Sequence, residues 1–241
     1  DVIFTVVSDD SAQLSIYNDP ADNLLLDEAK NTLFVNCATV SPHVHQTIEK
    51  HVLDHDAEVI EACMASSIPQ ARDGTLFLMI GGAPQAYERA KPILQHLAQE
   101  THYIGESGEA AKVKALVNLV MNMNTAALAE GLGIGQAHGI DLTVLKKIFS
   151  KTGAASRVLE TDGDDMIQRD HECFFSAEHA AKDTGIALSM ANQAALALPL
   201  AQATQQQYHR LILSGLGHLD KSGVAELTFP ERYPKNNNQS Q

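Results

Sequence analysis

The chain has 241 residues, a formal net charge of −13 and a hydrophobic fraction of 44%. This acidic balance argues against nucleic acid or an anionic membrane surface as partner, and no apolar run approaches the ~20 residues that span a bilayer. Three scattered cysteines fit reduced thiols in a cytoplasmic protein better than a disulfide framework.

The first hundred residues alternate between strand and helix patterns. The short apolar or β-branched runs Val2–Val7 and Thr32–Cys37 are predicted to be buried parallel strands. The amphipathic segment Pro42–His55 is predicted to be a helix. Further strands are predicted at Ala57–Ala62, Thr75–Ile80 and Thr101–Ile104. A helix is predicted at Ala86–Gln99, bent or broken at Pro92. This alternation indicates an α/β fold with a largely parallel sheet.

The remainder of the chain has a helical pattern. Between Glu109 and His138 apolar residues recur at spacings of three and four, namely Val113, Leu116, Val117, Val120, Met121 and Leu128. A helix of this length, about 45 Å, can leave one domain and form the spine of the next. An all-α domain is completed by helices predicted at Leu142–Ser150, Glu178–Leu196 and Pro199–Ser214. The polar tail Lys235–Gln241 is predicted to be disordered.

The start of the long helix contains the most informative residues. A turn marked by Gly105 and Gly108 leads into a helix that carries Lys114 and Asn118, which are four residues apart and therefore share a face. The helix dipole and the nearby charge of Lys112 both disfavour the protonated form of Lys114. A lysine that exchanges a proton beside a positioned amide suits chemistry at an alcohol or carbonyl. The alternative is a solvated lysine with an asparagine beside it.

Three more motifs accompany this pair along the chain. The segment Ala38–Pro42 follows the second strand, Phe175 precedes Lys182-Asp183 by seven residues, and Asp220-Lys221-Ser222 lies near the end. In this order, the motifs resemble those of the β-hydroxyacid dehydrogenase family, which includes 3-hydroxyisobutyrate dehydrogenases, tartronate semialdehyde reductases and glyoxylate reductases. The resemblance extends from residue 1 to about residue 227.

The resemblance implies part of a Rossmann-type nucleotide-binding domain at 1–105, an all-α domain built on the long interdomain helix at 106–227, and a tail at 228–241. A dinucleotide-binding domain normally begins with a G-x-G-x-x-G turn after its first strand. The sequence contains no such turn, and the glycines of 131–139 follow a helix pattern instead. We therefore expect an N-terminally truncated member that lacks the first βαβ units. The resemblance also implies a homodimer or homotetramer.

The implied activity is hydride transfer between NAD or NADP and a small β-hydroxy acid or its semialdehyde or keto form. Lys114 would act as general acid/base and Asn118 would hold it in place. The ligands are anions, so local cations such as Lys114 and Lys182 must offset the negative charge of the chain. The resemblance predicts cofactor contacts at Val7, Ser8, Thr39 and Lys182, and substrate contacts at Ser66, Ser67, Phe175 and Asp183.

The expected carboxylate-binding loop departs from the family pattern. The segment 61–74, EACMASSIPQARDG, aligns with the family's D-A-P-V-S-G-G loop, but Ala65 stands at the position of the serine. Ser66 and Ser67 replace the two glycines. Either the Ser66 hydroxyl binds the carboxylate from a shifted position, or the pocket is remodelled for another substrate. The added Cβ atoms narrow the approach and favour an altered substrate.

Two other classes of protein remain open. One is a non-catalytic dehydrogenase-like module used for dimerisation or partner binding, and the other is an imine-reducing relative. Retention of Lys114, Asn118 and Asp183 together argues against the first, and both relatives usually lack this lysine. Turnover of semialdehydes compared with cyclic imines would separate the second.

The histidines of the first predicted helix raise the question of a metal site. They are His43, His45, His51 and His55, of which the last two are four residues apart. No cysteine or carboxylate completes a recognisable motif in the sequence. The prediction is therefore a histidine-rich surface helix and no metal.

Overall fold

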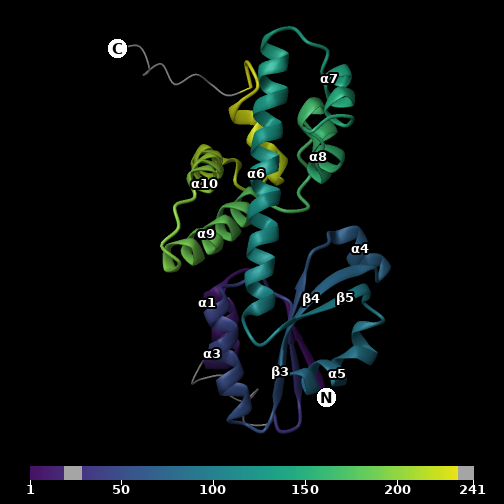
Figure 1. The fold of residues 1–241 in the computed structure, drawn as a ribbon, viewed down its shortest axis with the longest axis vertical. Helices are drawn as coiled ribbons and strands as arrows, with labels where there is room; N and C mark the ends of the chain where they lie inside the picture. Colours follow the sequence, from purple (N-terminus) through teal and green to yellow (C-terminus); the bar gives the residue numbers. More distant parts are fainter. Residues whose placement is uncertain (19–28, 233–241) are drawn as a thin grey trace. The chain divides into compact units, whose positions relative to one another are not determined.

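The computed structural model describes residues 1–18 and 29–232. The chain divides into two compact units, with the division between Val117 and Asn118. Each unit is described by itself, and Figure 1 shows their elements. The predicted disordered segment Lys235–Gln241 lies outside the described residues.

The first unit is built on a five-stranded sheet with strand order β1-β2-β3-β4-β5. The strands are β1 (Val2–Thr5), β2 (Leu33–Asn36), β3 (Glu58–Met64), β4 (Leu76–Gly82) and β5 (Ala98–Gly105). Three of the pairings are parallel, which confirms the largely parallel sheet, but β3 and β4 are antiparallel. The short connection 65–75 accounts for this difference, because a parallel crossover needs about a dozen residues or more.

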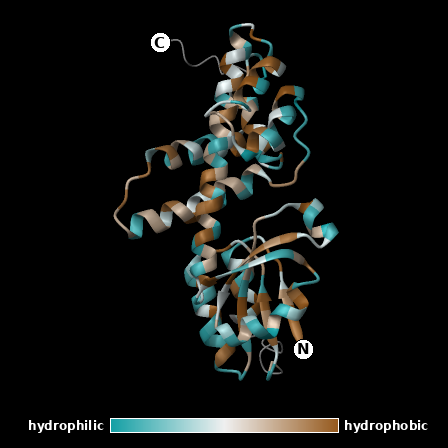
Figure 2. Ribbon diagram, turned by 45° about the vertical axis from the view of Figure 1, so that its right-hand side comes forward, coloured by the Kyte–Doolittle hydropathy of each residue, from teal (hydrophilic) through white to brown (hydrophobic). Residues whose placement is uncertain are grey.

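Helices cover both faces of this sheet (Figure 1). Along β2, Leu33 and Val35 pack with α5, whereas Phe34 packs with α3 on the opposite face, as the two-residue period of a strand requires. Figure 2 shows the hydrophobic residues gathered along the strands between these layers. The helices of this unit are α1 (Asp10–Asn18), α3 (Pro42–Leu53), α4 (Ile68–Asp73) and α5 (Pro84–Leu94).

Two predictions about this unit need correction. The run Val2–Val7 is not wholly buried, because β1 ends at Thr5 and lies at the edge of the described sheet. Phe4 and Val6 are accordingly 38% and 66% exposed. The predicted helix Ala86–Gln99 also extends too far. Pro92 lies within the last turn of α5, where its missing N–H weakens the helix, and the chain has turned into β5 by residue 98.

The long helix α6 (Glu109–Ala137) begins in the first unit and continues into the second. The second unit packs around a core that includes Leu132, Leu159, Met166 and Tyr208, and Phe229 is also buried there, beyond the predicted domain end at 227. Its other elements are α7 (Leu142–Phe149), α8 (Arg157–Gln168), α9 (Ala177–Gln193), α10 (Pro199–Leu211), the irregular turn η1 (Ile212–Leu216) and the 3-10 helix η2 (Lys221–Leu227). Among the described helices, none is both long and apolar enough to cross a membrane.

The buried face of α6 differs from the predicted apolar stripe. Leu116, Val117 and Val120 are exposed, whereas the polar side chains of Asn118 and Asn122 are buried. Alanines and polar residues, rather than the largest apolar side chains, therefore form much of the buried face.

The glycines near the end of α6 permit close packing. A Cβ atom at Gly135 would lie 2.5 Å from Leu145 Cδ2, and one at Gly133 would lie 2.8 Å from Thr228 Cγ2. Substitution there would require neighbouring atoms to move. Gly133 and Gly135 thus reflect close helix packing, whereas Gly139 lies beyond the end of α6 at a positive φ of 70°.

Candidate active site

Three loops of the first unit begin at the same edge of the sheet. Because β1, β2 and β3 are parallel, the residues that follow them lie at the same carboxyl edge, where open α/β sheets bind ligands. These loops contain Val7 and Ser8 after β1, Thr39 after β2, and Ser66 after β3. Val7 packs against the core beside α3, whereas Ser8 is exposed and donates a hydrogen bond of 2.7 Å to Asp9.

The two serines of the substituted loop make local backbone interactions. The Ser66 hydroxyl accepts a hydrogen bond of 2.8 Å from the Phe77 N–H, which extends the pairing of β3 with β4. Ser67 precedes α4, and its N–H donates to the Gln70 side chain at 3.1 Å. Ser66 can still donate its hydroxyl proton, so these contacts leave both sequence-based interpretations of the loop open.

A buried carboxylate holds the first turn of α6 against β3. Glu61, 2% exposed, accepts hydrogen bonds from the N–H groups of Gly108 and Ala111, the latter at 2.7 Å. A negative charge is favourable at a helix N-terminus. Burial nevertheless raises the pKa of Glu61 to about 7, against the opposing effect of these two hydrogen bonds.

Lys114 lies one helical turn beyond Ala111 and is nearly buried. The ammonium of Lys112 binds Glu109 at 2.6 Å. This ion pair offsets the like charge that was expected to act on Lys114, and residues two apart do not face each other on a helix. Lys114 and Asn118, four apart in α6, do share a helix face.

In the second unit, Asn118 is held by a buried carboxylate. Its Nδ2 donates to Asp183 Oδ2 at 2.5 Å, and Asp183 is 1% exposed. The other oxygen of Asp183 lies 3.0 Å from Lys182 Nζ. Three of the predicted site residues, from α6 and α9, are therefore in direct contact.

A ladder of buried polar residues continues along α6. Asn122 donates to Thr184 at 3.0 Å, and Thr125 donates to Asp162 at 3.2 Å. The same Asp162 carboxylate binds Lys221 at 2.8 Å. Asn122, Thr125, Asp162 and Thr184 were not predicted from the sequence, although Asn118, Asn122 and Thr125 are spaced by four and three residues, as positions on one helix face are.

The Asp220-Lys221-Ser222 motif organises the loop that contains Phe175. Asp220 accepts hydrogen bonds from the N–H groups of Phe174 and Phe175, at 3.1 and 2.9 Å, and Ser222 contacts His171 at 2.8 Å. Phe175 packs against the core of the second unit, with its ring 6.1 Å from that of His179. These contacts give Phe175 a structural role, and its predicted contact with substrate stays a prediction.

The second unit also has a pocket of about 580 Å³ near the C-terminal end of α8. Its lining includes His171 and Glu226, and Glu226 forms ion pairs with Arg169 and Arg232. No predicted site residue lines this pocket.

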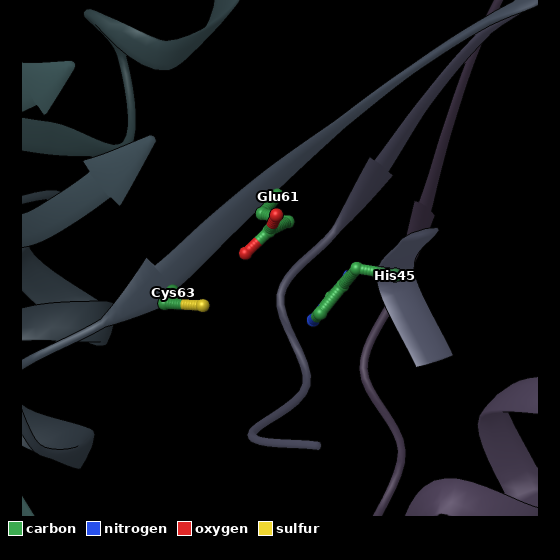
Figure 3. Close-up of side chains that lie close together, drawn as sticks. All are labelled: His45, Glu61 and Cys63. Carbon is green, nitrogen blue, oxygen red and sulfur yellow. The ribbon is translucent and has the colours of Figure 1, made fainter. Parts of the chain in front are cut away.

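The predicted surface position of the histidines is wrong for His45. This residue is 1% exposed because it lies next to Val44 and three residues before Ile48, on the buried face of α3. Its ring approaches Glu61 and Cys63 of β3 (Figure 3), so a carboxylate and a cysteine do join a histidine. Burial lowers the pKa of His45 to about 4, against the opposing charge of Asp10.

Known proteins match both units. Residues 108–228 match the family model described as NAD-binding of NADP-dependent 3-hydroxyisobutyrate dehydrogenase. Residues 1–105 match the NAD binding domain of 6-phosphogluconate dehydrogenase.

Individual relatives agree with these matches. The chain is 31% identical to glyoxylate/succinic semialdehyde reductase 2 of Arabidopsis thaliana over 80% of its length, and spans 54% of that protein. It is 26% identical to 2-(hydroxymethyl)glutarate dehydrogenase of Eubacterium barkeri over 94% of its length, and spans 75% of that relative. A solved 3-hydroxyisobutyrate dehydrogenase from Salmonella typhimurium matches the fold with a TM-score of 0.86 at 20% identity, covering 94% of this chain and 79% of that one.

Proposed function

The chain belongs to the β-hydroxyacid dehydrogenase family, and from this premise we propose that it acts as an NAD- or NADP-dependent oxidoreductase. Its substrate would be a small β-hydroxy acid or the corresponding semialdehyde or keto acid. The observation that carries the proposal is the buried Asn118–Asp183 hydrogen bond of 2.5 Å, four residues along α6 from Lys114.

In this proposal Lys114 moves the proton. In the oxidative direction its neutral Nζ takes the hydroxyl proton of the substrate as the carbonyl forms, and in the reductive direction the ammonium returns it. Asn118 orients the reacting groups, and Asp183 fixes the Asn118 amide through its 2.5 Å hydrogen bond. A bound nicotinamide would accept or supply the hydride.

The loops at the carboxyl edge of the sheet fit a nucleotide cofactor. The exposed hydroxyl of Ser8 and the half-buried Thr39 follow adjacent parallel strands, a common position for ligand contacts in α/β sheets. We assign Val7, Ser8, Thr39 and Lys182 to the cofactor. Ser66, Ser67, Phe175 and Asp183 are assigned to the substrate side, with Ser66 able to donate its hydroxyl proton to a carboxylate.

The oligomeric state and cellular location are part of the same proposal. The exposed apolar side chains of Leu116, Val117 and Val120 on α6 support self-association as a homodimer or homotetramer. The three cysteines are all within the described residues, and none forms a disulfide. Free thiols support a reducing compartment such as the cytoplasm. Sedimentation velocity would test the oligomeric state.

The experiment compares Lys114→Ala with Lys112→Ala, each introduced into a complete enzyme, in reduction of small semialdehydes by NADH and NADPH. We expect Lys114→Ala to lower kcat by about 10²–10⁴ with little change in cofactor affinity. Lys112→Ala serves as the matched control, because its side chain pairs with Glu109 on the same helix. Equal turnover of the two variants, or reduction of a cyclic imine in preference to any semialdehyde, would overturn the proposal.

A further inference from the structure

The buried imidazole of His45 has an unexplained environment. Neither Nδ1 nor Nε2 has a hydrogen-bond partner among the described residues, although the side chain is 1% exposed. Buried polar atoms are nearly always paired, and an unpaired group signals a missing water or ion. The ring is also a good metal ligand when it is neutral.

Two further ligand types surround this ring. Glu61 and Cys63 are two residues apart on β3, so their side chains point to the same face of the sheet, toward α3. One donor atom from each of His45, Glu61 and Cys63 lies within 4.8 Å of the others. Figure 3 shows the three side chains converging on one space.

We propose that His45, Glu61 and Cys63 bind a divalent transition-metal ion, with Zn²⁺ the best match. Nitrogen, oxygen and thiolate donors together suit this borderline ion, and a water would complete a tetrahedral site. A thiolate and a carboxylate also neutralise its two positive charges, so the buried site carries no net charge.

Zinc binding would require the donor atoms of His45, Glu61 and Cys63 to move only slightly closer together. Zinc–ligand bonds of about 2.0–2.3 Å place tetrahedral donors about 3.3–3.8 Å apart, so the three donors would move together by about 1 Å. The Glu61 oxygens have further lone pairs beside those used by Gly108 and Ala111. A bound ion would therefore link α3 and β3 to the first turn of α6, independently of the hydride chemistry proposed above.

The test uses the whole protein after treatment with a chelator and titrates it with Zn²⁺ or Co²⁺ alone. We expect one equivalent of Zn²⁺ to bind and to raise Tm. The Co²⁺ form should show an intense thiolate-to-cobalt charge-transfer band. His45→Asn should weaken binding by more than about 100-fold, above the 10–100-fold typical when a group that only supports a ligand is lost.

Matched variants identify the sulfur ligand. Cys63→Ser should abolish the charge-transfer band, whereas Cys37→Ser, at another buried thiol of the same unit, should retain it. His43→Asn, on the exposed face of α3, should also retain full affinity. Persistence of the band in Cys63→Ser, or its equal loss in Cys37→Ser, would overturn the assignment.

X-ray absorption of the zinc-loaded wild-type protein keeps the proposal testable if a variant does not fold. The expected result is one sulfur at about 2.3 Å together with nitrogen and oxygen at about 2.0–2.2 Å. Absence of a sulfur neighbour, or failure of the folded wild-type protein to retain zinc, would refute the site.

Discussion

The two buried polar clusters of this chain differ in how completely their members are paired. Around Asp183, the Asn118 amide donates a hydrogen bond to one carboxylate oxygen, and the other oxygen forms an ion pair with Lys182 but accepts no hydrogen bond from the described residues. Around His45, the ring nitrogens have no partner in the described structure, although Glu61 and Cys63 lie close by. A paired cluster stabilises the helical unit as it stands, whereas an unpaired one is costly until a ligand completes it.

Removal of Asp183 should have the largest effect on stability. Asp183→Ala leaves the buried Asn118 amide without its charged acceptor, so we expect the free energy of unfolding to fall by about 2–3 kcal/mol. Denaturant unfolding measures this change. Asp164→Ala is the control in the same unit, because Asp164 forms an exposed ion pair with Lys146 worth less than about 1 kcal/mol. Equal losses in the two variants would show that the Asp183 cluster is not specially stabilising.

The effect of replacing His45 on the free energy of unfolding should change sign when Zn²⁺ is added. In chelator-treated protein, His45→Leu removes two unpaired buried nitrogens, and the free energy of unfolding should rise by about 1 kcal/mol. With Zn²⁺ at 100 times its Kd, the wild-type protein should instead gain about 2.7 kcal/mol that the variant lacks. Thermal unfolding of both proteins, with His43→Leu as the exposed control on α3, distinguishes these results. If wild type and His45→Leu had the same order of stability with and without Zn²⁺, the prediction would be wrong.

A smaller effect should appear in the acidic region near Asp162. Burial, together with the charges of Asp162 and Asp220, raises the pKa of Asp165 above 3.8. Between the unfolded and folded pKa values the native state holds more protons than the unfolded state, so stability falls as the pH rises through this window. Asp165→Asn should flatten that decline in a series of unfolding curves. Asp164→Asn should not, and parallel pH profiles for wild type and Asp165→Asn would refute the prediction.

The sequence predicted regular patterns better than the partners of individual side chains. Strand β2 was found because it is a short apolar run bounded by polar residues, and helix α6 because apolar residues recur in it at spacings of three and four. Helix α8 was missed because Asp162 and Gly163 interrupt its buried face between Leu159 and Met166, which hides the apolar spacing in an acidic sequence. The antiparallel pairing of β4 likewise depends on the connection 65–75 and not on the strand's own residues.

Within the candidate site, helical spacing again decided what could be predicted. That Lys114 and Asn118 share a helix face could be predicted because they are four residues apart. The contact of Asn118 with Asp183 could not, because it joins residues 65 apart in the chain. The position of His45 beside Glu61 and Cys63 depends on how α3 crosses β3, which the local sequence does not encode. The alternation of Glu61 and Cys63 on one strand face was nevertheless visible.

The hydrogen bonds from Gly108 and Ala111 to Glu61 bear on how the protein folds during synthesis. The carboxylate that caps the start of α6 precedes these two residues by 47 and 50 positions, so the ribosome has already made it when the helix begins to emerge. Domains generally fold from the N-terminus as they are synthesised. The sheet can therefore offer α6 a preformed starting point, and the first turn of the helix can form before its remaining turns exist.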